Sequence, residues 1–124
     1  MKARGVLVVD DDAEIRETLS DLLADEGYAA REAENGLAAL ELLRTEPLPE
    51  VILLDWTMEA MNGQEFMAEV AKDPALAAIP VVLVTADVHV QEKVDSAPFV
   101  GHLTKPIRLP ALFQLLEQYT SPPR

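Results

Sequence analysis

The sequence predicts an α/β domain in which helices cover both faces of a parallel β-sheet. Three short, continuous apolar runs, 6–9, 51–54 and 81–84, are rich in β-branched residues, as is typical of strands buried on both faces. Segments with the period of an amphipathic helix lie between these runs, so strand and helix patterns alternate along the chain. A length of 124 residues suits one globular domain rather than two.

The first strand, 6–9, is followed by a predicted helix that begins at Ala13. Asp12 is well placed to cap that helix, and Gly27 stands where a helix C-terminus favours glycine. Its buried face is predicted to consist of Ile15, Leu19, Leu22 and Leu23. The next strand, 28–33, has a weaker pattern.

The middle of the chain repeats this alternation. Leucines from Leu37 through Leu40 to Leu43 predict the buried face of a second helix, which precedes the strand at 51–54. Phe66 and Val70 indicate a third helix before the strand at 81–84. We interpret the segment 72–74 between that helix and that strand as a loop.

The last third of the chain is less regular. The segment 88–95 is rich in valine and gives the least clear helix pattern, and 99–103 is a weak strand candidate. The final helix has a well-defined apolar face and is expected to end before Ser121. That face consists of Leu109, Leu112, Phe113 and Leu116.

Composition excludes several classes of function. Asp and Glu number 22 against 10 Lys and Arg, and the formal net charge of -12 disfavours direct binding to nucleic acid or to an anionic membrane. Because the chain has no cysteine, thiolate chemistry and Cys-based metal sites are impossible. No apolar run approaches the length of a membrane span, and the N-terminus lacks the pattern of a signal peptide. We therefore expect a cytoplasmic domain.

Chemically reactive side chains follow four of the predicted strands. Asp10 and Asp11 come after the first strand, Asp55 after the run at 51–54, Thr85 after the run at 81–84, and Lys105 after the last strand candidate. Taken alone, each has an ordinary structural explanation. An aspartate at the end of a strand is common in turns, Thr85 could simply be a β-branched strand residue, and Lys105 could be a solvated surface lysine. The carboxyl ends of parallel strands share one edge, however, so these side chains can meet there.

Together these groups suit phosphoryl transfer. Adjacent carboxylates repel one another unless a cation shares them, and ligands that are all oxygen indicate Mg²⁺ rather than Zn²⁺. A hydroxyl and an ammonium group can bind the oxygens of a phosphoryl group. The combination is far more specific than any of its members.

In these motifs the sequence resembles the receiver domain of two-component response regulators. The matching segments are Val6 to Asp12, Leu53 to Met58, Met61 to Gly63, Val84 to Ala86 and Thr104 to Pro106. The resemblance implies a flavodoxin-like three-layer αβα sandwich, with five helices and a five-stranded parallel sheet of order 2-1-3-4-5. It also implies that residues 1–124 are a single receiver domain with no output domain in this chain.

The resemblance assigns a role to each matching residue. Asp55 is the phosphoacceptor, and Asp10, Asp11, Asp55 and the backbone carbonyl of Thr57 form the Mg²⁺ site. Thr85 and Lys105 bind the phosphoryl oxygens, and His102 stands at the aromatic switch position. Pro106 is expected to follow a cis peptide bond.

The sequence departs from the family pattern in three ways. Glu59 stands where proline is usual, His102 replaces an aromatic residue, and the stretch from Thr85 to Lys105 is short. This stretch encodes the fourth helix, which is part of the usual output face.

The function implied is acceptance of a phosphoryl group on Asp55 from a sensor histidine kinase or a histidine phosphotransfer protein. The signal then passes to a protein target through the face of the fourth helix, fifth strand and last helix. Beyond self-phosphorylation and slow dephosphorylation, no enzymatic activity is expected. The alternative is a pseudo-receiver that binds partners without phosphorylation. An electron carrier is disfavoured because the loop after the first strand is triply acidic.

Overall fold

The computed structural model describes residues 4–45, 47–55, 63–85 and 99–120. Five parallel strands form one sheet with the order β2-β1-β3-β4-β5, which confirms the predicted fold class. The strands are Arg4–Val9 (β1), Tyr28–Ala33 (β2), Val51–Asp55 (β3), Val81–Thr85 (β4) and Gly101–Thr104 (β5). β3 and β4 are buried along their whole length, as their continuous apolar runs predict.

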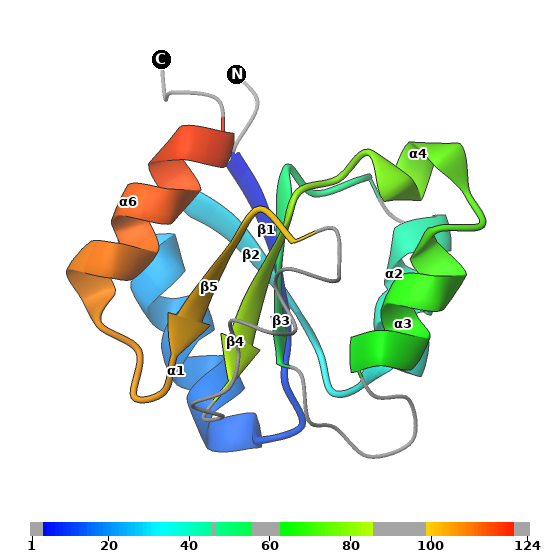
Figure 1. The fold of residues 1–124 in the computed structure, drawn as a ribbon. Coiled ribbons are helices and arrows are strands. Elements are labelled where there is room, and N and C mark those ends of the chain that lie inside the picture. The colour runs from blue at the N-terminus through cyan, green and yellow to red at the C-terminus, as the bar shows by residue number, and fades with distance from the viewer. Residues whose placement is uncertain (1–3, 46, 56–62, 86–98, 121–124) are drawn as a thin grey trace.

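Helices cover both faces of the sheet (Figure 1). On one side α1 (Ala13–Asp25) and α6 (Leu109–Tyr119) pack against a core that includes Val8, Leu53 and Val84. On the other side lie α2 (Gly36–Thr45), α3 (Gly63–Val70) and the short α4 (Pro74–Ala77). Successive strand residues thus alternate between two apolar cores.

α1 begins and ends as predicted. Asp12 is its N-cap, and the Asp12 side chain accepts hydrogen bonds from the backbone N–H groups of Glu14 and Ile15. Gly27 follows the C-cap with a φ of 90°, a conformation that glycine adopts at little cost. Leu19 and Leu23 are fully buried, whereas Leu22 and Ile15 lie at the edge of the buried face.

One local prediction was wrong, and another was incomplete. Leu37 is 53% exposed, because the buried face of α2 consists of Gly36, Ala39, Leu40 and Leu43. The segment predicted as a loop at 72–74 is a turn as far as Asp73, which caps α4, but Pro74 is already the first residue of that helix. The helix expected at 88–95 lies outside the described residues.

Among the described residues, no helix combines the length and apolarity that crossing a bilayer requires.

Candidate functional site

The carboxyl ends of the central strands bring the predicted site residues together. Asp10 follows β1, whereas Asp55 and Thr85 are the last residues of β3 and β4. The register pairs Val9 with Leu54 and Asp55 with Val84, so these ends lie side by side at one edge of the sheet. Asp10, Asp55 and Thr85 are all buried. Three polar side chains buried at the ends of apolar strands mark this edge as a functional site.

The three carboxylates expected to hold a metal form a compact cluster. Asp10, Asp11 and Asp55 each offer an oxygen atom, and these atoms all lie within 4.8 Å of one another. Asp10 and Asp55 are only 2% and 6% exposed, whereas Asp11 is exposed. Negative charges this close repel one another unless a cation lies among them.

The three consecutive aspartates of the β1–α1 loop have different surroundings. Asp12 caps α1, and its backbone N–H donates a 2.9 Å hydrogen bond to Oδ1 of Asp10. The backbone N–H of Asp10 in turn donates to the carbonyl of Ala33 at the end of β2. Asp10 is therefore held through both its main chain and its side chain, which leaves Asp11 as the exposed acid of the cluster.

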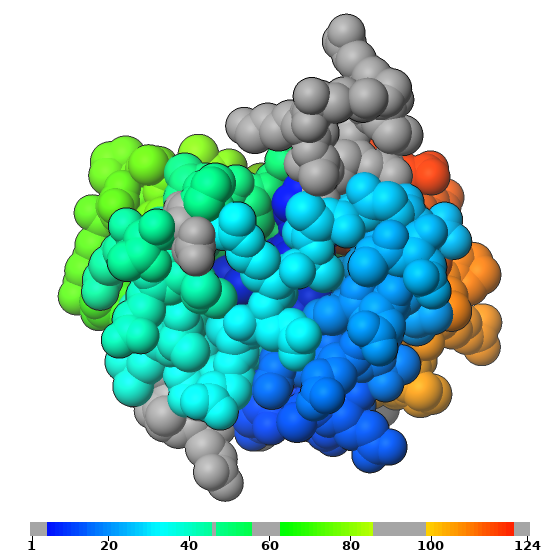
Figure 2. All heavy atoms as spheres, turned by 180° about the vertical axis from the view of Figure 1, so that it is seen from behind, coloured from blue at the N-terminus to red at the C-terminus, as the bar shows by residue number. Residues whose placement is uncertain are grey.

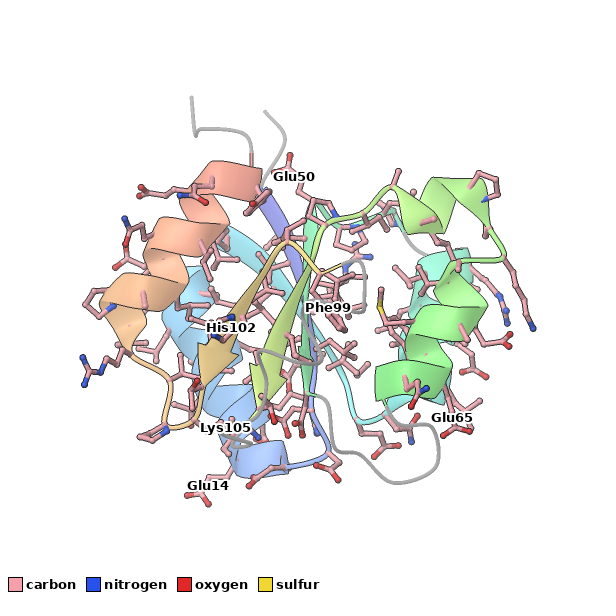
Figure 3. The ribbon with its side chains drawn as sticks, in the orientation of Figure 1. Glu14, Glu50, Glu65, Phe99, His102 and Lys105 are labelled. Atoms are coloured by element: carbon pink, nitrogen blue, oxygen red, sulfur yellow. The ribbon has the colours of Figure 1, made fainter. Side chains whose placement is uncertain are left out.

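Lys105 is the cation beside the cluster. Its Nζ lies 3.3 Å from Oδ2 of Asp10 and 3.6 Å from Oδ2 of Asp55. Its backbone N–H donates to the carbonyl of Thr85, which ties the end of β5 to the end of β4. Figure 3 shows Lys105 at the same end of the sheet as Glu14 of α1, whereas Glu50 lies at the opposite end. The Lys105–Pro106 peptide bond is cis, as the resemblance implies.

Of the other predicted site residues, His102 is described by its position in the sheet, and Thr57 is not described. His102 lies on β5 in register with Leu83, and Thr104 is in register with Thr85. Because residues two apart on a strand share a face, His102 and Thr85 lie on the same face of the sheet. Thr57 and Glu59 lie outside the described residues, so their roles stay predictions.

Arg16 is a residue near the site that the sequence analysis missed. Its Nη1 donates a 2.7 Å hydrogen bond to the backbone carbonyl of Asp10, and its Nε donates to Oε1 of Glu32 at 3.1 Å. The available signal was its position one helical turn after the N-cap Asp12, since helix side chains lean toward the N-terminus.

The family model of the response regulator receiver domain matches residues 6–117. The chain belongs to this family. The geometry agrees with the match, because the acidic cluster and Lys105 meet at the edge of the sheet where receiver domains carry their phosphorylation site. Receiver domains exchange signals with histidine kinases and downstream effectors.

Known proteins similar to this receiver domain include both sequence relatives and solved structures. The phosphate regulon transcriptional regulatory protein PhoB of Escherichia coli is 39% identical over 68% of this chain and 36% of its own length. A response regulator receiver protein from Pseudomonas putida superposes with a TM-score of 0.87 at 28% identity, covering 95% of this chain and 98% of that one. The response regulator TrrA of Thermotoga maritima, solved in complex with Mg²⁺ and BeF, superposes with a TM-score of 0.82 at 28% identity. The superposition covers 94% of this chain and 98% of that one.

The donor atoms of this receiver domain fit Mg²⁺. The side chains that would hold the ion are Asp10, Asp11 and Asp55, and their carboxylate oxygens are the hard ligands that this ion prefers. When bound, the ion would offset the charge of the cluster and allow an anionic phosphoryl group to approach Asp55.

Asp55→Asn is expected to raise the melting temperature of the metal-free domain. The substitution removes one of three carboxylates that repel one another and leaves Lys105 paired with Asp10. Functional sites often retain such unfavourable charges at the expense of stability. Thermal unfolding in EDTA tests this expectation, and added Mg²⁺ should stabilise the wild type more than the variant. A clear loss of stability in EDTA would instead indicate that Asp55 ties the loops together.

Proposed function

We propose that this receiver domain accepts a phosphoryl group on Asp55 from a phosphohistidine of a sensor histidine kinase or histidine phosphotransfer protein. The P–N bond to the histidine breaks, a P–O bond to a carboxylate oxygen of Asp55 forms, and the imidazole nitrogen keeps the electron pair. The observation that carries this proposal is the position of Lys105 Nζ between the buried carboxylates of Asp10 and Asp55.

Three described residues of the site, Asp55, Lys105 and Thr85, take part in the proposed phosphoryl transfer. Asp55 supplies the attacking oxygen, and a carboxylate nucleophile needs no general base to remove a proton from it. Lys105 is close enough to Asp55 to pair with the incoming phosphoryl oxygens as they gain charge. Thr85, buried at the end of the neighbouring strand, offers a hydroxyl group on the same edge. The aspartyl phosphate is the signal-bearing form of the domain.

The second candidate function is a pseudo-receiver that binds partners without phosphorylation. Glu59 favours it, because an additional acid follows the acceptor where the family usually has proline. The acidic cluster with its paired lysine favours the first proposal, because a module that only binds partners has no need for three crowded carboxylates.

Incubation with acetyl phosphate and Mg²⁺, followed by intact-mass measurement, separates the two functions. The proposal predicts the addition of one phosphoryl group, and EDTA should prevent it. A mass that does not change, under conditions that phosphorylate a known receiver domain, would favour the pseudo-receiver.

Lys105→Arg is expected to reduce phosphorylation sharply although it keeps the positive charge. Lys105 is 22% exposed and fits between two buried carboxylates as a compact ammonium group. A planar guanidinium is larger and requires a different hydrogen-bonding geometry. Rates of phosphorylation by acetyl phosphate test this, with Lys72→Arg on the exposed Glu69–Lys72 pair as the matched control. Equal rates for wild type and Lys105→Arg would show that only the charge is needed.

The remaining parts of the proposal concern the setting of the reaction. We propose signalling to a protein target through β5, α6 and the helix expected at 88–95, with Thr85 and His102 as the switch pair. We also propose a cytoplasmic location and no enzymatic turnover beyond self-phosphorylation and slow dephosphorylation. Phosphorylation-dependent protection of β5 in hydrogen exchange, lost in Thr85→Ala, would support this output face.

A further inference from the structure

Arg16 connects three elements at the edge of the metal cluster. It lies on α1, its Nη1 donates to the carbonyl of Asp10 after β1, and its Nε donates to Glu32 on β2. Figure 2 shows α1 in blue and the β2–α2 part of the chain in cyan side by side on the back of the molecule. The Arg16 side chain is only 15% exposed, and its contact with Asp10 is partly buried, whereas its pair with Glu32 is exposed.

The contact with Asp10 is the more significant of the two. At 2.7 Å it is a short, charge-assisted hydrogen bond, and it reaches the main chain of a residue whose side chain belongs to the acidic cluster. The backbone carbonyl of Ala33 accepts a hydrogen bond from the backbone N–H of Asp10. The peptide groups on both sides of the Asp10 Cα atom are therefore held, which limits how far its carboxylate can move.

The pair with Glu32 orients the guanidinium. A guanidinium has a rigid fork of donors, so a carboxylate bound at Nε directs Nη1. Glu32 is itself on β2, which pairs with β1 in register from Arg4 to Val9. The strand that neighbours β1 thus supports the residue that holds the end of β1.

We infer that Arg16 is a positioning residue for the metal site, held in place by Glu32. It presets the carboxylate of Asp10 for a divalent cation without touching the cation itself. This inference rests on the proposed function, because it concerns the Mg²⁺ affinity of the same cluster. Partners that orient metal ligands typically change metal affinity by about 10- to 100-fold when they are removed.

For Arg16, a simple charge effect predicts a change in Mg²⁺ affinity of the opposite sign, whereas for Glu32 the two explanations predict the same sign. Removing a cation near three carboxylates would strengthen their attraction for Mg²⁺, whereas removing an acid at Glu32 would weaken it. Positioning predicts that both changes weaken binding. Replacing Glu32 should lower the Mg²⁺ affinity less than replacing Arg16 does. The Glu32 side chain is 36% exposed, and without it Arg16 can still donate its hydrogen bond to the carbonyl of Asp10.

Calorimetric titration with Mg²⁺ alone tests the inference on wild type, Arg16→Met, Arg16→Lys and Glu32→Gln. We expect affinity to fall by about tenfold in Arg16→Met. A smaller loss is expected in Arg16→Lys, since a single ammonium keeps the charge but lacks the fork that reaches both partners. Circular dichroism establishes that each variant is folded at the titration temperature.

Arg31→Met is the matched control. Arg31 lies on β2 next to Glu32 and also donates from Nη1 to a backbone carbonyl, that of Pro47, so the variant loses the same charge but leaves the Arg16–Asp10 contact in place. Its Mg²⁺ affinity should equal that of the wild type. A lower melting temperature with unchanged Mg²⁺ affinity in folded Arg16→Met or Arg16→Lys would overturn the inference, as would tighter binding in Arg16→Met. A wild type that does not bind Mg²⁺ would overturn the proposed function together with this inference.

Discussion

Asp55→Ala is expected to abolish the addition of a phosphoryl group from acetyl phosphate. The variant lacks the attacking oxygen, and no other acid of the cluster is equivalent to it. Oδ1 of Asp10 accepts a hydrogen bond from the backbone N–H of Asp12, so the carboxylate of Asp10 is tied to the β1–α1 loop. Asp11 is exposed and lies in the β1–α1 loop rather than at the end of a central strand. Intact-mass measurement and peptide mapping of the trapped ester report the result.

Asp12→Asn is the matched control for this experiment. It removes a carboxylate next to the cluster but keeps a side chain that caps helices well, so α1 should begin as in the wild type. Phosphorylation should persist in this variant. Full phosphorylation of Asp55→Ala would place the acceptor elsewhere and contradict the proposed mechanism.

Asp11→Asn is expected to abolish the response of the domain to millimolar Mg²⁺. Asp11 is the exposed acid of the cluster, so its carboxylate can bind a cation that arrives from solvent. Asparagine keeps an oxygen but loses the negative charge that attracts a hard cation. The loss should exceed the roughly 10- to 100-fold effect of changing a partner that only orients a ligand. Fluorescence of Trp56, the only tryptophan, and calorimetry can both follow the titration.

Asp73→Asn provides the comparison, because Asp73 caps α4 and is equally an aspartate before a helix. Figure 1 places α4 at the opposite end of the molecule from the carboxyl ends of the strands. This variant should bind Mg²⁺ like the wild type. Unchanged Mg²⁺ binding in Asp11→Asn would remove Asp11 from the metal site.

Most of the elements could be predicted because their signals are local. Continuous apolar runs identified β1, β3 and β4 to within two residues, and Asp12 and Gly27 marked the ends of α1. The prediction failed at Leu37, because a pattern of large apolar residues gives too little weight to Ala39 and Gly36, which are buried in its place. It also missed α4, although an aspartate followed by proline is a known signal for a helix start.

The sequence by itself determined the alternation of strands and helices and the identity of the reactive side chains. The sheet order came from the resemblance, since periodicity does not say which strands are neighbours. Only the tertiary structure decided which atoms meet. Lys105 pairs with Asp10 and Asp55. Arg16 donates hydrogen bonds to the backbone carbonyl of Asp10 and to the carboxylate of Glu32. The physical reason is that secondary structure depends on the dihedral angles and periodicity of nearby residues, whereas these contacts join segments far apart in sequence. They depend on strand register and on the packing of α1 against the sheet, which no local pattern encodes.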